Sequence, residues 1–450
     1  MLSGRFGRRL RASRADLQSG PGTARRLGKG RRLGKGRRLG KAGNVAAMTA
    51  MLVPVLIGAA GVASDTAQWV LVRRALQRQA DSAALAGAYA LTQGQAASSG
   101  ALADIGKNQN YTLANVPLIE NAPRVGPFAG VATAVRVRLT ATSRLPFSSA
   151  FLGRGVTISA EAVAGLERDG DYCIIALDTS PTLGITNSGN TLVDAQCGMH
   201  ANSTGEPAIT GQGSATIFAS PVSASGSINN GGNFAAGTVF TPYNVQQRDP
   251  FADLPNPSPT GPVYNNVRVQ SNRTQTLQPG TYRGGLNIQG TANLAPGVYY
   301  IDGRNNGDLS IGSQAVVNGT GVTFVLSNSD FTSSTTSGTA APVRINGGAT
   351  LNITAPDAGT YAGVLMYQDR RATAMSETAR INGNSSSRLR GALYFPKNEL
   401  LFNGTSGMDI DCLQMVGYRI TFTGTSDIRN ICPALSGSGA FKGDVVRLLG

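Results

Sequence analysis

The sequence predicts a single N-terminal transmembrane helix that continues as a helix outside the membrane, followed by an all-β domain folded as a right-handed parallel β-helix-like solenoid. Three observations predict this architecture: an uncharged apolar stretch behind a basic tail, helix-forming residues directly after it, and apolar triplets that recur with Gly and Asn. We expect a basic tail at 1–43, the transmembrane helix at 44–64, a helical and strand region at 65–170, the solenoid-like domain at 171–435 and a C-terminal tail at 436–450.

The basic character of the chain belongs to one short tail. The 450 residues carry a formal net charge of +15, from 40 Lys and Arg against 25 Asp and Glu. Residues 1–43 hold 14 of these bases and one acid, Asp16, in a tail that contains three copies of RRLGKG or RRLGKA at 25–30, 31–36 and 37–42. Because the bases are spaced by glycine without aromatic residues, we expect no nucleic-acid partner. Contact with RNA or anionic lipid is the alternative use of the tail.

The stretch 45–64 (VAAMTAMLVPVLIGAAGVAS) has no charged residue and is long enough to span the hydrocarbon of a bilayer, roughly 30 Å. The basic residues before it favour a cytoplasmic N-terminus, which places the following chain in the periplasm of a bacterial inner-membrane protein. A cleavable signal peptide is the alternative, although its apolar region would be shorter and residues 59–63 (AAGVA) form only a weak cleavage site.

The four cysteines predict disulfides in an oxidising compartment. Cys173 and Cys197 are 24 residues apart, and Cys412 and Cys432 are 20 apart, so neither pair has zinc-ligand spacing. We expect the bridges Cys173–Cys197 and Cys412–Cys432, which agree with a periplasmic domain. Four free buried thiols are the alternative.

The region after the membrane segment predicts helices and then strands. Residues 65–91 contain no Pro, and apolar or small residues recur on one face of a helix: Val72, Leu76, Ala80, Ala83, Gly87 and Leu91. We expect this periplasmic helix to continue the membrane helix and a second short helix to cover 95–110. The alternating stretches 134–141 and 156–163 predict two strands.

The same region resembles a known family. The run GNVA at 43–46, the GVASD that closes the apolar stretch at 61–65, and LQRQADSAALAGA at 76–88 together are similar to the N-terminal region of TadG-like proteins of Flp (Tad) pilus assembly. The resemblance covers about 43–92 and extends more loosely to 165. It implies a role in assembling or anchoring a pilus or secretion apparatus, with other pilus-assembly or envelope proteins as partners. Met48 stands where prepilins carry Glu, so prepilin processing is not expected.

The rest of the chain predicts stacked short strands. LQPGTY at 277–282 recurs as LAPGVY at 294–299, 17 residues later, and the triplets ING, FNG and FTG begin at Ile381, Phe402 and Phe422, at steps of 21 and 20. Such a period is typical of a solenoid, in which each repeat buries its apolar face only against its neighbours. A β-sandwich is the alternative fold. We expect protruding loops or irregular coils at 223–268 and 332–339.

No residue is assigned to catalysis, a cofactor or a metal. Asp178, Ser180 and Thr182 are spaced like a magnesium site, which would suit a metal-dependent adhesin, but a polar turn is the preferred interpretation. Asp369, Asp409 and Asp411 are the acids that a tethered polysaccharide lyase or hydrolase would use, yet exposed turn carboxylates are preferred. His200 is expected to be structural. The predicted function is therefore a non-enzymatic envelope component, with polysaccharide contact as a further possibility.

Overall fold

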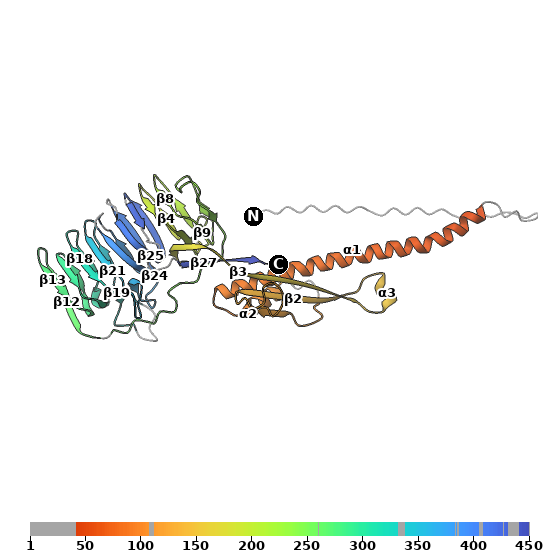
Figure 1. The fold of residues 1–450 in the computed structure, drawn as a ribbon, viewed down its shortest axis with the longest axis horizontal. Helices are drawn as coiled ribbons and strands as arrows, with labels where there is room; N and C mark the ends of the chain where they lie inside the picture. Colours follow the sequence, from red (N-terminus) through yellow and green to blue (C-terminus); the bar gives the residue numbers. More distant parts are fainter. Residues whose placement is uncertain are drawn as a thin grey trace, which may run out of the picture. The chain divides into compact units, whose positions relative to one another are not determined.

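The structure of the chain is a computed structural model that describes residues 42–107, 112–259, 261–331, 338–382, 384, 387–404, 408–425, 427–430 and 441–449. Most of the predicted tail at 1–43 and of the predicted loop at 332–339 therefore lies outside the described residues. The chain divides into two compact units, residues 1–63 and 64–450. One long helix that is apolar in its first part, followed by a largely β region, confirms the predicted fold class in outline (Figure 1).

The helices and the antiparallel strands of the second unit follow the predicted pattern. Helix α1 spans Ala42–Thr92, and α2 spans Ala97–Lys107. They are followed by β1 (Leu118–Asn121), β2 (Ala134–Ser143), α3 (Ser148–Leu152) and β3 (Val156–Ala176). β2 pairs antiparallel with both β1 and β3. The predicted helices at 65–91 and 95–110 and strands at 134–141 and 156–163 are therefore confirmed. The predicted boundary at residue 170 falls inside β3, which runs through it without a break.

Small side chains allow α1 to pack closely against its neighbours. The buried face of α1 presents Leu76, Ala80, Ala83, Ala84 and Ala88 to apolar residues of α2, β2 and β3. A Cβ atom on Gly87 would lie 2.9 Å from a methyl group of Val135, and one on Gly100 of α2 would lie 2.4 Å from the carbonyl oxygen of Ala86. The Ala- and Gly-rich sequence at 83–88 thus meets a steric demand, because larger side chains would separate the helices from each other and from the sheet.

The described strands of the β domain pair in three parallel ladders. Strands that follow β3 directly are β4 (Ile185–Asn187), β5 (Leu192–Asp194), β6 (Gly198–Ala201), β7 (Ile209–Gly211), β8 (Thr216–Phe218), β9 (Val222–Ala224), β10 (Ile228–Asn229) and β11 (Phe240–Thr241). The later strands are β12 (Val263–Val269), β13 (Thr274–Leu277), β14 (Gly280–Ile288), β15 (Thr291–Leu294), β16 (Gly297–Asp302), β17 (Leu309–Ile311), β18 (Val316–Thr320), β19 (Val322–Ser327), β20 (Val343–Ile345), β21 (Thr350–Thr354), β22 (Val364–Gln368), β23 (Thr378–Ile381), β24 (Arg388–Gly404), β25 (Met408–Gly424) and β26 (Asp427–Asn430), with the short 3-10 helix η1 (Arg304–Asn306) between β16 and β17.

The repeats seen in the sequence correspond to neighbouring strands. Leu277 lies opposite Leu294 where β13 pairs with β15, which is the predicted step of 17 residues. Phe402 lies opposite Phe422 where β24 pairs with β25, and their rings stack with centroids 5.2 Å apart. One ladder also aligns a file of buried isoleucines, at positions 288, 311, 345 and 381. Each apolar triplet therefore covers the equivalent triplet of the next strand, and the layers share one core.

The order of the strands in space departs from their order in the chain. β25 pairs with β3 and β4, and β26 pairs with β5, so Met415 lies opposite Ile174, which is 241 residues earlier. We call these pairings of β25 and β26 with β3, β4 and β5 the seam. On one side of the seam lie β6 to β11, in chain order. The chain then resumes at β12, at the opposite end, and returns through β14 to β24. In Figure 1 the blue strand β25 accordingly lies between the cyan β21 and the yellow-green β4.

Of the two alternatives predicted for 223–268, a protruding loop or irregular coils, the structure shows largely irregular chain, and the segment that joins the two halves packs against the domain. Parts of that interval form β9 to β12, and residues 242–262, here called the crossing segment, bury apolar side chains. Phe251 and Leu254 contact a buried cluster that includes Tyr172 and Tyr394. The Arg370 guanidinium donates hydrogen bonds to the backbone carbonyls of Phe251, Ala252 and Leu254. The Pro, Gly and Asn residues of this interval suggested that it could protrude, but Phe251 and Leu254 attach it to the domain.

The end of the chain is also structured, which corrects the predicted tail at 436–450. Residues Phe441–Leu448 form β27, which pairs antiparallel with β3 from Tyr172 back to Ala164. Phe441 packs against the same buried cluster as Phe251, and their ring centroids are 5.5 Å apart. The stretch has no regular apolar alternation, and it forms a strand by pairing along the edge of β3.

We predict that the seam contributes a large share of the stability of the β domain. Phe422 is fully buried, stacks on Phe402 and lies on the strand that pairs with β4. Phe422→Ala should therefore cost about 3–5 kcal/mol, because it leaves a cavity in a close-packed core. The matched control is Phe218→Ala, since Phe218 of β8 is 45% exposed. Urea denaturation of the detergent-solubilised chain should show a lower midpoint for the first variant alone, and equal midpoints would contradict this assignment.

Candidate functional site

The first feature is an apolar helical surface that no other described residue covers. Among the described residues, one helix, Val45–Thr92, is long and apolar enough to cross a membrane. Its large apolar side chains between 45 and 63 are between 43% and 78% exposed: Val45, Met48, Met51, Leu52, Val53, Val55, Leu56, Ile57 and Val62. Water would disfavour such a surface strongly, whereas the hydrocarbon core of a bilayer would accept it. Pro54 lies within the helix, as is tolerated in membrane helices.

The end of the apolar stretch is marked by a buried carboxylate. Asp65 of α1 is only 6% exposed, and it accepts hydrogen bonds from the backbone N–H groups of Phe147 and Ser148, at 2.8 and 2.6 Å, and from the Ser148 hydroxyl. This carboxylate thereby attaches the connection between β2 and β3 to the start of the second unit. Trp69 and Arg73 follow Asp65 by one and two turns of α1, and the Arg73 guanidinium lies 5.2 Å from the centre of the Trp69 ring, a cation–π contact.

The three residues that resemble a magnesium site form a polar turn instead. Asp178 is fully buried and accepts hydrogen bonds from the Ser180 backbone N–H at 2.9 Å and from the Thr182 hydroxyl at 3.1 Å. The Arg419 guanidinium pairs with the same carboxylate at 2.7 Å. Burial raises the pKa of Asp178, but the hydrogen bonds from Ser180, Arg419 and Tyr418 outweigh it and lower the pKa to about 2. The carboxylate is therefore matched by protein donors, and it fixes the loop after β3 to β25.

The acids considered for carbohydrate chemistry are not assembled into a pair by the described residues. Asp369 is fully buried and accepts hydrogen bonds from the Arg371 guanidinium, at 2.7 and 3.0 Å, and from the Ser327 hydroxyl at 2.7 Å. The side chains of Asp409 and Asp411, on β25, lie outside the described residues. The prediction of an exposed turn carboxylate is therefore wrong for Asp369, which forms a buried ion pair with Arg371 and supports the turn after β22.

A cavity of about 280 Å³ lies near this ion pair. It is lined by Tyr300, Asp302, Phe331 and Arg371, among others. Asp302 accepts backbone hydrogen bonds from Arg304, at 3.1 Å, and from Ser329, at 2.9 Å, and it is the only carboxylate among the described lining residues. Hydrolysis of a glycosidic bond ordinarily uses two facing carboxyl groups. Aromatic and polar side chains line the cavity.

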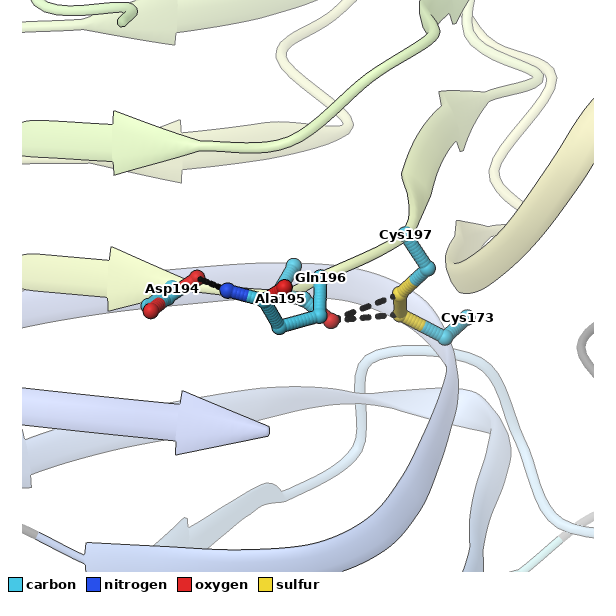
Figure 2. Close-up of a disulfide and its surroundings, with 5 residues drawn as sticks. All are labelled: Cys173, Asp194, Ala195, Gln196 and Cys197. Carbon is cyan, nitrogen blue, oxygen red and sulfur yellow. Dashed lines mark hydrogen bonds between the residues drawn. A yellow bond between two sulfur atoms is a disulfide. The ribbon is translucent and has the colours of Figure 1, made fainter. Parts of the chain in front are cut away.

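The first predicted disulfide is confirmed. Cys173 of β3 is joined to Cys197, which directly precedes β6, across the first repeat of the domain (Figure 2). The turn before Cys197 carries Gln196 at a positive φ of 55°, and its side-chain amide donates to Asp194 at 2.6 Å. The predicted partner bridge cannot be assigned in the same way, because Cys432 and the side chain of Cys412 lie outside the described residues.

His200 is structural, as predicted, and it belongs to a buried polar network that the sequence did not reveal. Its two ring nitrogens lie 3.1 Å from the Ser223 hydroxyl and 2.9 Å from the amide oxygen of Asn202. Asn202 in turn donates to the backbone carbonyl of Gln247 in the crossing segment. The side chain of Gln247 completes the network by exchanging two hydrogen bonds with the backbone of Asp444 in β27, at 2.8 and 2.9 Å. We call this network the clasp, because it joins β6, β9, the crossing segment and β27.

Comparison with known families finds a match for the N-terminal region of the chain. Residues 43–90 match the model of a family described as putative Flp pilus-assembly TadE/G-like, which confirms the resemblance found in the sequence. The match coincides with α1 and ends before α2. Comparison with curated proteins and with solved structures finds no match. The match thus covers most of α1 and no part of the β domain.

We predict that the clasp makes stability depend on pH through His200. Burial lowers the pKa of His200 to about 4, whereas the ordinary value is 6.5. Between pH 6.5 and 4, only the unfolded chain takes up a proton on His200. The contribution of neutral His200 to the free energy of unfolding is therefore fully present above pH 6.5 and is lost as pH falls towards 4. The loss should be roughly 3 kcal/mol. Carboxylates also titrate in this range, so the measurement compares urea midpoints of the native chain and of His200→Gln at several pH values. The variant should lose less stability on acidification, and parallel curves would exclude this role for His200.

Proposed function

We propose that the chain is a single-pass bacterial inner-membrane protein that acts without catalysis in assembling or anchoring a Flp pilus or a related secretion or adhesion apparatus. The observation that carries the proposal is a coincidence of two findings. The residues that match the Flp pilus-assembly family, 43–90, include both the exposed apolar stretch at 45–63 and the part of α1 that packs against α2, β2 and β3. A match that includes the whole apolar segment agrees with a shared anchoring role.

The orientation we propose places the N-terminus in the cytoplasm and the β domain in the periplasm. The 14 Lys and Arg of residues 1–43 precede the apolar segment directly, and such residues are retained on the cytoplasmic side. The Cys173–Cys197 bridge supports this orientation, because disulfides persist in the periplasm and are rare in the cytoplasm.

The β domain would act as a binding module. We propose that its three parallel ladders form a right-handed β-helix-like solenoid, whose extended faces suit contact with other envelope proteins. The buried acids Asp178 and Asp369 support a non-catalytic role, because each is neutralised by an arginine and lies inside the fold. Partners in this proposal are other pilus-assembly proteins on the periplasmic side of the inner membrane.

The proposal predicts that charge within the apolar segment abolishes function. Val55 and Leu56 are 66% and 63% exposed near the middle of this segment. Replacing both by Lys should prevent insertion, since each Lys at the centre of a membrane helix costs roughly 2.5–3.5 kcal/mol. In a host strain that lacks the gene, this variant should be recovered in the soluble fraction and should not restore pili or adhesion.

The matched control for this experiment introduces the same charges on the β domain. Val239 and Tyr243 are 59% and 66% exposed there, so Val239→Lys with Tyr243→Lys should leave membrane association and pilus assembly unchanged. Normal pili and adhesion in the strain without the gene would reject the proposed function. Loss of pili together with correct membrane insertion of the Val55→Lys, Leu56→Lys variant would reject the anchoring role of the segment.

A further inference from the structure

The connection between β2 and β3 exposes an apolar pair that the fold does not use. Residues 144–155, here called the hairpin tip, include α3, which buries none of its own residues. Phe151 is 75% exposed and Leu152 is 56% exposed. Phe151 makes an edge-to-face contact with Phe147 at 5.0 Å. Two exposed arginines, Arg144 and Arg154, flank the pair, and neither forms an ion pair with any described residue.

The hairpin tip is held at the point where the apolar segment ends. Asp65 accepts hydrogen bonds from the backbone N–H groups of Phe147 and Ser148 and from the Ser148 hydroxyl, so the start of α3 is attached to this carboxylate. Asp65 is the second residue after Ala63, and successive Cα atoms are about 3.8 Å apart, which keeps Asp65 within roughly 8 Å of the end of the segment. The headgroup layer on each side of a bilayer is roughly 5–8 Å thick. The Asp65 contacts therefore hold the tip at headgroup depth.

The neighbouring side chains have the character of a membrane interface. Trp69 and Arg73 follow Asp65 by one and two turns of α1. Tryptophan is enriched where membrane helices meet water, and arginine pairs with the phosphates of anionic lipids. Phe151 and Leu152 between Arg144 and Arg154 repeat this combination on a second element. An apolar pair flanked by cationic side chains suits a lipid surface, because the acyl chains accept Phe151 and Leu152 and the phosphates accept the arginines.

We propose that the hairpin tip is a second membrane contact, in which Phe151 and Leu152 enter the boundary between headgroups and acyl chains and Arg144 and Arg154 bind phosphates of anionic lipids. This inference rests on the proposed function, because it requires the apolar segment to lie in the bilayer. Two points of attachment, α1 and the tip, restrict rotation of the β2–β3 hairpin about α1. Since β3 continues into the β domain, the contact gives the domain a defined presentation above the membrane.

The test measures the depth of residue 151 in the intact chain. The sequence has one Trp, so Trp69→Phe with Phe151→Trp gives a single fluorescent reporter at the tip. The full chain is reconstituted into liposomes of phosphatidylethanolamine and phosphatidylglycerol, with or without bromine on the upper acyl chain. We expect blue-shifted emission and about two-fold lower fluorescence with brominated lipid. The control reporter is Tyr243→Trp in the same background, because Tyr243 is 66% exposed on the β domain, and its emission should not change.

The arginines are tested in the same system. Arg144→Gln with Arg154→Gln should reduce the quenching at residue 151 in liposomes that contain phosphatidylglycerol and should have little effect in purely zwitterionic ones. Flotation of the liposomes distinguishes failure of the tip contact from failure of the membrane anchor. If the chain floats but the reporter at 151 emits as in water, the tip contact is wrong and the anchor stands. If the chain does not float, the proposed anchor fails, and the tip contact fails with it.

Discussion

A single strand, β3, is the element on which the rest of the structure depends. Its first part pairs antiparallel with β2, and its last residues pair in parallel with both β6 and β25. Between these regions it also pairs with β27. The sheet that packs on α1 and the ladders of the β domain are therefore one hydrogen-bonded system. At its last residues β3 is paired on both sides, with β6 and with β25, so it joins the helical region directly to the ladders of the β domain.

The packing around Tyr172 explains how so many chain segments can meet at the end of β3. Tyr172 is fully buried, and a Cβ atom on Gly443 of β27 would lie 1.9 Å from its ring. A Cβ atom on Gly198 of β6 would lie 2.9 Å from the same ring. Both neighbours must therefore be glycine for the ring to fit. The ring also meets His200 edge to face at 5.7 Å, and the Cys173 bridge follows directly, so the clasp, the disulfide and the seam converge there.

The sequence predicted those features of the fold that are determined by residues close together in the chain. Absence of charge at 45–64, helical periodicity after it and the recurring triplets around Phe402 and Phe422 predicted the long helix, the short strands and their spacing. The seam could not be predicted in this way, because the steps between neighbouring repeats are the same whether the chain enters the stack at its end or at its middle. Asp178 shows the same limit for a site: its nearby Ser180 and Thr182 suggested a metal, whereas the partner that decides its role, Arg419, lies 241 residues away.

The position of the seam makes the β domain a closed unit with both of its chain ends at one place. Neither half can bury its inner layer at the seam without the other, and the pairing partners are far apart in the sequence, which is typical of slow, cooperative folding. The central claim is therefore that β26 lies beside β5. The most direct test replaces Asp194 and Arg429, which are in register across this pair, by Cys in a background that lacks Cys412 and Cys432. A short bis-maleimide should link residues 194 and 429, and should not link 194 with a Cys at Arg273. A link to residue 273 instead, or no link at 429, would contradict the seam.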